Sequence, residues 1–479
     1  MFRLKDLIEL IPQSIPLGDQ DIEWQSLSID SRTIKPGDLF LALKGERVDG
    51  HQFILSACQK GAIGIVMEKT FFSDHPSIAD ECKKPFLLVD NTLFAFQKWA
   101  HHYYSLYKPF SICITGSNGK TTTKEIINHI LASKYHVLKS QGNYNNEIGV
   151  PLTLFGLTPY HDVMVVEMAA QRVGEIKNLT NIVKPDIAVI TNVGEAHVGL
   201  FGCRDNIAKE KAEIILALKD KGTAVLNRDD SYFNYFRDCL SHHNELVSFG
   251  FHPEADLRAS NIQQVKEKGI SFDLLLPGGR THRLLIPLLG QFNTYNVMAA
   301  IAVGMKMHVP LDEIFHGLST FKSLKMHMEC SEFHRGIILI KDYYNANPTA
   351  TEEALMTVSD ISKDGFKVAV LGDMLELGSE IQEYHRDIGR KAASLSYDMI
   401  IGFGEYGHDI QQGAQEQGMP VDKIFQFDVK DKEKLVNHLV RSVPDKSIVL
   451  IKGSRNMKME DIVQYWQNKE KKGGKREHD

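Results

Sequence analysis

The sequence contains no apolar run approaching the roughly 20 residues that a membrane-spanning helix needs. Its first residues, MFRLKDLIELIPQSIPLG, break at prolines and carry charges every few positions, which is not the pattern of a secretory signal peptide. The net charge is only -6, so nothing indicates a general nucleic-acid or membrane surface. These absences predict no nucleic-acid partner and no membrane insertion.

The cysteines show no CxxC or other metal-ligand spacing. Several of them lie inside apolar runs, as reduced core cysteines do, and this favours a cytoplasmic location. Internal repeats and long low-complexity stretches are also missing. The basic run at 469–476 is typical of a disordered, solvated tail. The six cysteines are Cys58, Cys82, Cys113, Cys203, Cys239 and Cys330.

What the chain does contain is a recurring order of short apolar strand, turn and helix-like segment. These strands lack polar alternation, as strands buried on both faces do, and their spacing by helical patterns predicts parallel α/β sheets. A chain of 479 residues is too long for one ordinary core. The predicted strands are 110–115, 163–166, 187–191, 367–371, 399–401 and 448–451.

Changes in this pattern predict three domains. The first covers 1–85 and is rich in loops, the second covers 86–318, and the third covers 319–479 with a disordered tail from about 469. The first two breaks fall near the Lys-Lys-Pro at 83–85 and before the strand that opens at 337.

The strongest local signal is ICITGSNGKTTT, in which an apolar strand runs into a glycine turn and a helix. Glycines let backbone N–H groups surround a phosphate, and the helix N-terminus favours the same negative charge. Lys120 would reach the β- and γ-phosphates, and the Thr121 hydroxyl would bind Mg²⁺. The longer GxxxxGK[ST] pattern fails at Ile114, so the motif is GxxGKT from Gly116. A turn that merely joins strand to helix is the alternative, but the strand context favours ATP binding.

Polar side chains follow the next predicted strands. Glu167 ends one strand, and Asn192 follows another, with His197 five residues later. The carboxyl ends of parallel strands share one edge with the phosphate loop, and hard oxygen ligands suit Mg²⁺. Taken alone, His197 is more often a surface or core residue, and the charged helix at 206–214 is more often a solvated face.

Together these segments resemble the Mur ligase family, ATP-dependent enzymes that build the peptide of peptidoglycan precursors. The family motifs TGxxGKTTT, a strand-ending glutamate, TNxxxxH and an AKxK-type helix match 115–123, Glu167, 191–197 and 208–211. In the family, a lysine of the AKxK-type helix is often carbamylated and bridges a second Mg²⁺. Lys211 is the matching position in this chain. The resemblance implies a small N-terminal α/β UDP-sugar domain, a central P-loop-type, mostly parallel sheet, and a C-terminal Rossmann-like α/β domain.

Further segments are similar to those of the family member that acts last in the cytoplasmic pathway. They imply UDP-N-acetylmuramoyl-tripeptide and D-alanyl-D-alanine as substrates, an acyl-phosphate intermediate, and release of ADP and phosphate. The third residue of the tripeptide stays open, and a monomer is expected. The segments are 29–32, 36–40 and 44–51, then 142–151, then 342–348 and 371–378, and finally 452–460.

Site residues carried over from the family fall into four groups. The catalytic set is Lys120, Glu167, His197 and Lys211, and the metal set is Thr121, Glu167, His197 and Lys211. ATP binding is assigned to Thr115, Gly116, Ser117, Asn118, Gly119, Lys120, Thr121, Thr122, Asn293, Asn296 and Asp342. Substrate binding is assigned to Ser31, Arg32, Lys44, Gly45, Asp49, Asn143, Asn145, Asn146, Asn345, Asn347 and Lys452.

One departure concerns the start of the third domain. The family usually has glycine-arginine before Met-Glu, whereas this chain has Met326-His327, with Lys325 nearby as a substitute cation. An always-charged bidentate donor is thereby replaced by a group that titrates near neutrality. His197 and Asp342 are both candidates for the base that accepts the amine's proton.

Two other functions stay open at this point. The first is another ligase of the superfamily, such as a folylpolyglutamate synthase or a Mur ligase that adds a single amino acid. The second is a P-loop NTPase that couples hydrolysis to a conformational switch and needs no amine acceptor.

Overall fold

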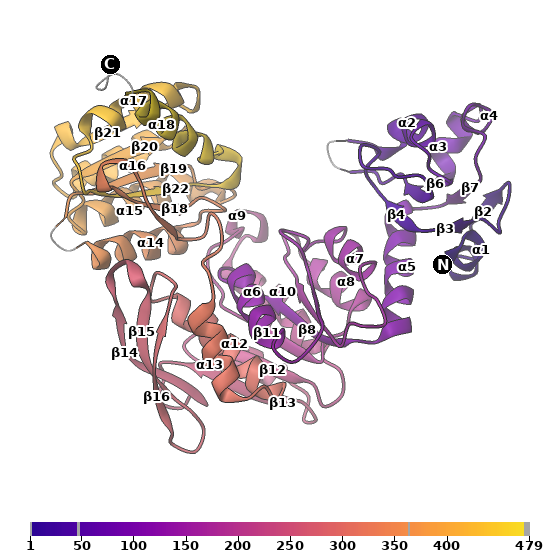
Figure 1. The fold of residues 1–479 in the computed structure, drawn as a ribbon, viewed down its shortest axis with the longest axis horizontal. Helices are drawn as coiled ribbons and strands as arrows, with labels where there is room; N and C mark the ends of the chain where they lie inside the picture. The colour runs from indigo at the N-terminus through magenta and orange to yellow at the C-terminus, as the bar shows by residue number, and fades with distance from the viewer. Residues whose placement is uncertain (1, 46–47, 363–364, 474–479) are drawn as a thin grey trace. The chain divides into compact units, whose positions relative to one another are not determined.

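A computed structural model describes residues 2–45, 48–362 and 365–473. The chain forms two compact units, each interleaved in sequence. The first unit consists of Met1–Ser111, Leu138–Val166 and Asn178–Lys184, and the second of Ile112–Val137, Glu167–Lys177 and Pro185–Asp479. Figure 1 labels the elements of both units.

The first unit is built around a sheet with the strand order β2-β7-β6-β5-β4. Strands β4 to β7 pair in parallel, and β2 pairs antiparallel with β7. Because β7 belongs to this sheet, the sheet continues past residue 85. The strands are β1 (Phe2–Arg3), β2 (Ile15–Leu17), β3 (Glu23–Trp24), β4 (Ser26–Ser28), β5 (Asp38–Leu41), β6 (Gly64–Glu68) and β7 (Phe86–Val89). The helices are α1 (Leu4–Leu10), α2 (Ile54–Gln59), α3 (Lys69–Asp74), α4 (Ile78–Cys82) and α5 (Thr92–Tyr107).

Side chains that alternate along β5 build two cores on opposite faces of this sheet. Leu39 and Leu41 lie in a cluster with Trp99 of α5, whereas Phe40 lies in a cluster with Ile54 of α2. Successive side chains of a strand point to opposite faces, so a strand covered on both sides is apolar throughout. The unit also holds β9 (Val137–Lys139), α7 (Gly149–Leu154) and most of β10 (Val163–Glu167).

A disulfide joins Cys58 at the end of α2 to Cys82 at the end of α4. The interpretation of the cysteines as typical of a reducing compartment, which rests on several of them lying in apolar runs, is therefore wrong for this pair. Their Cα atoms lie 5.8 Å apart although the residues are 24 positions apart in the sequence, a proximity that no local spacing reveals. Cys113 is a buried free thiol in β8, as predicted, and burial raises its pKa.

The central sheet of the second unit has the strand order β16-β15-β14-β13-β12-β11-β8. Strands β8, β11, β12 and β13 pair in parallel, and β14, β15 and β16 form an antiparallel extension. The strands are β8 (Phe110–Thr115), β11 (Ile187–Ile190), β12 (Thr223–Asn227), β13 (Glu245–Gly250), β14 (Leu257–Gln264), β15 (Ile270–Leu275) and β16 (Thr281–Ile286). The helices are α6 (Lys120–Leu131), α8 (Glu175–Ile182), α9 (Val198–Phe201), α10 (Arg204–Leu216), α11 (Phe233–Asp238), α12 (Asn293–Lys306) and α13 (Leu311–Thr320).

The C-terminal part of the second unit holds a sheet with the order β17-β18-β22-β19-β20-β21, parallel except for β17. Its strands are β17 (Glu329–Glu332), β18 (Ile338–Asp342), β19 (Lys367–Gly372), β20 (Met399–Phe403), β21 (Ile424–Phe427) and β22 (Ile448–Lys452). Its helices are α14 (Pro348–Ile361), α15 (Ile381–Ser394), α16 (Gly407–Glu416), α17 (Lys432–Ser442) and α18 (Glu460–Gly473).

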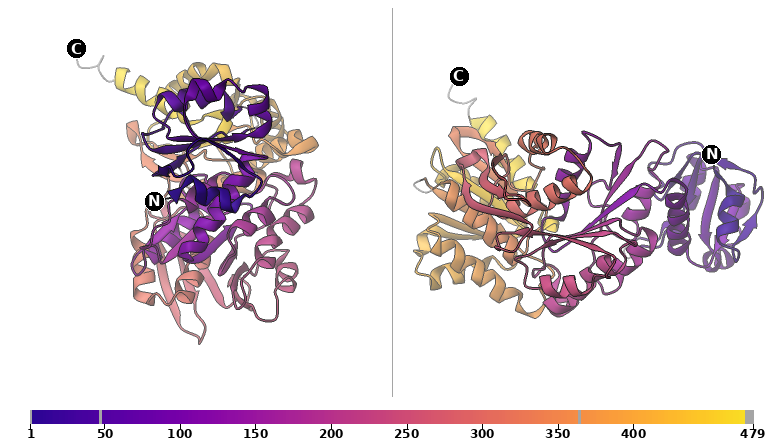
Figure 2. Two further views of the ribbon diagram at one scale, coloured as in Figure 1. Left: turned by 90° about the vertical axis from the view of Figure 1, so that its right-hand side faces the viewer. Right: turned by 90° about the horizontal axis from the view of Figure 1, so that it is seen from below.

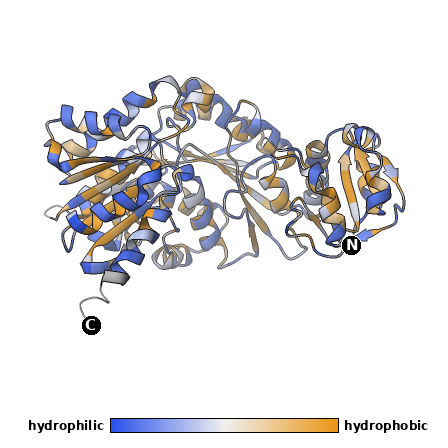
Figure 3. Cartoon of the chain, turned by 90° about the horizontal axis from the view of Figure 1, so that it is seen from above, coloured by the Kyte–Doolittle hydropathy of each residue, from blue (hydrophilic) through white to orange (hydrophobic). Residues whose placement is uncertain are grey.

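Helices cover both faces of this C-terminal sheet (Figure 2). Ala369 of β19 lies in a core with Leu355 of α14, whereas its neighbour Val370 lies in a core with Leu439 of α17 and Trp466 of α18. The strands are accordingly hydrophobic along their length, as Figure 3 shows. This is the doubly wound arrangement that the apolar runs predict.

The strands predicted at 110–115, 163–166, 187–191, 367–371, 399–401 and 448–451 are all present. The tail predicted from about 469 is wrong up to residue 473, because α18 continues to Gly473. Lys469 donates to Asn437 and Glu470 pairs with Arg335, which ties this segment to the domain. Residues 474–479 lie outside the described part of the chain. None of the helices described is both long and apolar enough to span a membrane.

Candidate active site

The phosphate loop joins β8 to α6 and depends on two glycines. Gly119 has a φ of 80°, and a Cβ there would overlap the Asn296 side chain. Gly116 has a φ of 151°, and a Cβ there would overlap Thr191 Oγ1. Both positions favour glycine for its backbone conformation and for lack of space. Neighbouring side chains therefore hold the loop closely from outside.

The Thr-Asn pair after β11 fixes the middle of this loop. Thr191 Oγ1 donates to the carbonyl oxygen of Asn118 at 2.6 Å, and Asn192 Oδ1 accepts the backbone N–H of Asn118 at 2.9 Å. The backbone N–H of Ser117 donates to the carbonyl oxygen of Asn192 at 2.9 Å. The loop amides of Ser117 and Asn118 are thus engaged within the protein. The amides that open α6, from Lys120 onward, have no partner within the helix and suit an anion.

Lys120, Thr121 and Glu167 come together at this loop. Lys120 Nζ donates to the carbonyl oxygens of Gly116, at 2.7 Å, and Ser117, at 3.1 Å. Thr121 Oγ1 donates to Glu167 Oε2 at 2.9 Å. Removal from water lowers the pKa of Lys120, and the nearby Glu167 carboxylate partly offsets that effect. The strand-end glutamate and the P-loop threonine, both of which belong to the predicted metal set, therefore contact each other.

Lys211 lies on the buried face of α10, close to Lys120. Burial, followed by the positive charge of Lys120, lowers the pKa of Lys211 to about 7, while Glu210 and Asp230 act in the opposite direction. The Asp230 carboxylate is held by the backbone N–H of Val193 at 2.7 Å. A lysine with this pKa is neutral in a substantial fraction of molecules near pH 7.

His197 contacts a residue of the C-terminal domain. Its Nδ1 atom lies 2.5 Å from Glu376 Oε2 of the C-terminal domain, and this hydrogen bond lowers the pKa of Glu376. In the described part of the chain, no three His, Cys, Asp or Glu residues form a cluster that could hold a metal ion. The structure thus joins two members of the predicted metal set, places Lys211 nearby, and turns His197 to Glu376.

The asparagine pair at the start of α12 lies behind the phosphate loop. Asn296 Nδ2 donates to Asn293 Oδ1 at 2.8 Å, and Asn293 Nδ2 donates to the carbonyl oxygen of Leu289 at 2.7 Å. Thr123 Oγ1 of α6 donates to Asn296 Oδ1 at 3.2 Å. The pair therefore links α12 to α6, and both asparagines are buried.

Asp342 and Lys452 end two neighbouring strands of the C-terminal sheet. They occupy paired register positions on β18 and β22, and Lys452 Nζ lies 2.5 Å from Asp342 Oδ2. The same amine donates to the carbonyl oxygen of Asn345 at 3.3 Å. Lys452 is buried, so its charge holds the loop after β18 rather than facing solvent.

That loop continues into α14, whose first turn contacts the central domain. Asn347 Oδ1 caps the helix by accepting the N–H of Ala350 at 3.0 Å, and Asn347 Nδ2 donates to Asn118 Oδ1 at 2.7 Å. Thr349 donates to Glu195 in the loop after β11. Asn347, predicted to bind substrate, is thus also a helix cap and a contact to the phosphate loop.

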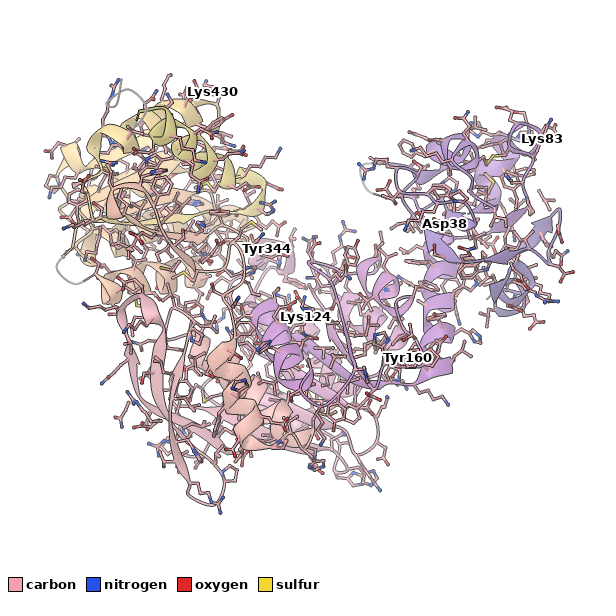
Figure 4. All side chains as sticks on the ribbon, in the orientation of Figure 1. Asp38, Lys83, Lys124, Tyr160, Tyr344 and Lys430 are labelled. Carbon is pink, nitrogen blue, oxygen red and sulfur yellow. A yellow bond between two sulfur atoms is a disulfide. The ribbon has the colours of Figure 1, made fainter. Side chains whose placement is uncertain are left out.

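His327 occupies the position where the family has arginine. Its ring stacks on Tyr344 with 4.5 Å between centroids, and Nδ1 contacts the carbonyl oxygen of Lys325 at 2.9 Å. Tyr344 is labelled in Figure 4. Burial and the charge of Glu167 raise its pKa, and the charge of Arg455 only partly offsets this rise. Arg455, which the sequence analysis did not single out, is therefore close enough to this part of the site to affect the pKa of Tyr344.

The substrate residues predicted in the first unit occupy turns and caps. Arg32 is exposed and forms a bidentate pair with Asp30, with a shortest contact of 2.7 Å that helps lower the pKa of Asp30 to about 2. Asp49 Oδ1 accepts the N–H of His51 at 3.0 Å, and Asn146 Oδ1 accepts that of Gly149 at 2.9 Å.

The remaining predicted residues of this unit lie in two parts of the sequence, residues 31–49 and residues 143–146. Ser31 is buried beside Arg32. Lys44 and Asp49 form an isolated β-bridge, and the N–H of Gly45 donates to the carbonyl oxygen of Val48 at 3.0 Å. In the second region, the N–H of Asn145 donates to the carbonyl oxygen of Asn143 at 2.8 Å.

Three further residues enter the site without having been predicted for it. Lys124 lies 3.5 Å from Glu167, Glu376 pairs with His197, and burial raises the pKa of Glu353 on α14 to about 7. Helical spacing could have identified Lys124, because it follows Lys120 by one turn. The other two depend on contacts between distant segments.

Comparison with known proteins now identifies the class. Residues 23–104 match the Mur ligase family catalytic domain, 114–304 the Mur ligase middle domain, and 328–455 the Mur ligase glutamate ligase domain. The chain belongs to the Mur ligase family, and the predicted family and three-domain α/β organisation are confirmed. Members of this family are ATP-dependent ligases.

Among its relatives, the chain is similar to UDP-N-acetylmuramoyl-tripeptide--D-alanyl-D-alanine ligase over nearly its whole length. It is 32% identical to the protein of Bacillus subtilis (strain 168), with 96% of this chain and 97% of the relative covered. Identity to the protein of Escherichia coli (strain K12) is also 32%, with 93% and 94% covered.

Solved structures agree with these sequence matches. A crystal structure of MurF from Acinetobacter baumannii has a TM-score of 0.86 and 30% identity, covering 98% of this chain and 99% of that one. MurF ligase from Thermotoga maritima in complex with ADP has a TM-score of 0.81 and 28% identity, covering 95% and 100%. A Mycobacterium tuberculosis folylpolyglutamate synthase, at 17% identity and a TM-score of 0.58, shares the fold alone.

Proposed function

We propose that this protein uses ATP to join D-alanyl-D-alanine to UDP-N-acetylmuramoyl-tripeptide, giving a UDP-muramoyl-pentapeptide precursor of peptidoglycan. The observation that carries the proposal is the full-length similarity to ligases of that name, 32% identical over 462 residues. The phosphate loop supports it, because Thr191, Asn192 and Asn296 hold the loop in the shape that a nucleotide needs.

The reaction proceeds in two steps. The terminal carboxylate of the tripeptide attacks the γ-phosphorus of ATP, so that an acyl phosphate forms and ADP leaves. The amine of D-alanyl-D-alanine then attacks the acyl carbon, phosphate leaves, and an amide forms with loss of one proton. No protein nucleophile is needed. His197 and Asp342 remain candidates for the base, although Glu376 and Lys452 respectively engage them here.

The residues at the loop perform charge stabilisation. The amides that open α6 bind phosphate oxygens, and Lys120 exchanges its two carbonyl contacts for the transferring phosphoryl group. Asn293 and Asn296 support the adenine side of the site from α12. Because Asn347 touches Asn118, α14 brings the C-terminal domain to the same loop, where the amino substrate must arrive.

Thr121 and Glu167 fit a magnesium ion, since a hydroxyl and a carboxylate in contact are hard oxygen donors beside a phosphate cradle. Thr121 and Glu167 would hold the ion, which would supply positive charge against the negative charge of the phosphates. His197 would join this set only after release from Glu376.

Lys211 is the proposed site of carbamylation. A lysine must be neutral to react with CO₂, and its buried surroundings lower the pKa to about 7. Carbamylation converts the amine into an anionic oxygen ligand beside Lys120, which would serve a second Mg²⁺. We further propose that the enzyme is a cytoplasmic monomer, in keeping with its small-molecule substrates.

The test is phosphate release from ATP and Mg²⁺ with UDP-N-acetylmuramoyl-tripeptide, measured with and without D-alanyl-D-alanine. We expect release to require both substrates and to yield a UDP-muramoyl-pentapeptide. Hydrolysis indifferent to both would support an NTPase switch instead. A product formed with a single amino acid would keep the chemistry and move the enzyme elsewhere in the superfamily.

A further inference from the structure

Lys124 is a fully buried lysine next to the proposed magnesium site. Its side chain has 0% exposure, and its Nζ atom lies 3.5 Å from Glu125 Oε1 and 3.5 Å from Glu167 Oε2. The Glu167 side chain is only 2% exposed. Figure 4 labels Lys124 on α6.

The helix dictates this placement. Lys120, Thr121 and Lys124 lie within one turn of α6, and residues three and four apart share a helical face. Lys120 contacts the loop carbonyls, Thr121 contacts Glu167, and Lys124 reaches the same carboxylate one turn further along. Thr121 Oγ1 and Lys124 Nζ both approach Oε2, so together they orient the Glu167 carboxylate.

Burial explains why the interaction matters. An ammonium group removed from water is tolerated only beside a counter-charge, so Lys124 and Glu167 are held together. The pair therefore fixes the position of the Glu167 carboxylate beside Thr121, where a hard cation would be bound. Groups that orient a ligand are commonly as important to metal affinity as the ligand itself.

We propose that Lys124 is a positioning residue of the magnesium site. Its ammonium group holds the Glu167 carboxylate in one orientation before the metal arrives with the nucleotide. This inference rests on the proposed function, because it takes Thr121 and Glu167 as the magnesium ligands. Lys124 itself touches neither metal nor substrate.

Calorimetric titration of ADP over a series of Mg²⁺ concentrations tests the proposal without any chemical turnover. In K124M, which keeps the length and apolar stem of the side chain, we expect the Mg²⁺ concentration for half-maximal enhancement to rise by about tenfold or more. ADP binding in excess chelator should stay close to wild type, since the loop amides are unchanged. If K124M does not fold, the same titration is made with K124Q, which is neutral but can donate a hydrogen bond.

Two comparisons separate positioning from general destabilisation. E125Q removes the other partner of Lys124 and is expected to leave the Mg²⁺ dependence unchanged. In a double-mutant cycle, K124M should add no further defect to E167Q, because both act through one carboxylate. Wild-type Mg²⁺ dependence in K124M or K124Q would overturn the inference, as would equal effects of K124M with and without E167Q. Absence of any Mg²⁺-dependent ADP binding by the wild-type chain would instead count against the proposed function.

Discussion

His385 shows how one side chain fixes a signature loop of the C-terminal domain. It is fully buried, its Nε2 atom accepts the N–H of Met374 at 2.9 Å, and its Nδ1 atom lies 2.6 Å from the carbonyl oxygen of Ile381. A ring that accepts at one nitrogen and donates at the other must be neutral. Burial accordingly lowers its pKa, although Asp373 and Asp409 oppose the effect.

This geometry makes the stability of the C-terminal domain depend on pH. The folded pKa lies below the unfolded value of about 6.5, so the unfolded state binds more protons as pH falls through that value. The contribution of His385 to the stability of the domain is therefore fully present above that pH. It is lost as the pH falls below that value, by at most about 1.4 kcal/mol per pH unit. H385Q should lack this decline. The urea midpoint between pH 7 and 5.5 measures it, with Trp466 fluorescence as the probe in a chain lacking Trp24 and Trp99. Parallel pH profiles would contradict the prediction.

The glycine requirement of the phosphate loop could be predicted from the sequence, and the structure explains why the missing glycine is harmless. Ile114 is a buried residue of β8 whose carbonyl oxygen accepts the N–H of Met168 at 2.8 Å. It precedes the turn, which needs glycine only at Gly116 and Gly119. The longer motif has a glycine at position 114, which in this chain still belongs to strand β8.

At the scale of elements, α14 couples its own cap to the phosphate loop through Asn347. N347D keeps the oxygen that caps the helix and loses the amide donor to Asn118, whereas N347A loses both. We expect N347A to cost about 1 kcal/mol of domain stability and N347D to cost little. Both variants should lose turnover, because each removes the donation from Asn347 Nδ2 to Asn118 Oδ1. N347D keeps only the longer contact from Asn118 Nδ2 at 3.4 Å, and N347A loses that contact as well.

Thermal unfolding and steady-state rates, measured on the same preparations, separate these two effects. T351S serves as a control, since its hydroxyl keeps the bond to the carbonyl oxygen of Asn347 seen at 2.8 Å. Full turnover in N347A, which removes both hydrogen bonds of the pair, would show that the contact with Asn118 has no part in catalysis.

The strands of the fold were largely predictable, and the exceptions share a cause. Runs such as residues 163–166 of β10 are apolar throughout because both faces are covered. By contrast β14, with the sequence LRASNIQQ, and β16, with THRLLI, are exposed on one side and do not read as buried strands. Contacts such as Asn118 to Asn347 join residues 229 positions apart, and no local pattern encodes them.

At the scale of the whole molecule, the disulfide lies in the first unit alone. Cys58 and Cys82 close a loop of 24 residues, and losing such a loop destabilises the folded state by about 3 kcal/mol. Reduction, or the double variant C58A/C82A, should therefore lower the unfolding midpoint reported by Trp24 and Trp99. The midpoint reported by Trp466, in the second unit, should not change.

C203S provides the matched control, since Cys203 is an exposed free thiol in the second unit. Unfolding is followed with and without reductant in a chain that keeps only the relevant tryptophans. Equal midpoints for the first unit would indicate that the cross-link adds nothing to its stability.

The contact of Asn118 with Asn347 is subject to thermodynamic linkage with nucleotide binding. Asn118 belongs to the loop that receives nucleotide, and Asn347 belongs to the domain that must meet the amino substrate. If nucleotide binding changes the equilibrium constant for forming this contact by some factor, then forming the contact changes the affinity for nucleotide by the same factor. If nucleotide strengthens the contact, a ligand that tightens the hold of α14 on the loop raises the affinity for ADP by the same factor, and a ligand that loosens it lowers that affinity. A single pair of asparagines would then link nucleotide affinity to the position of the domain that meets the amino substrate.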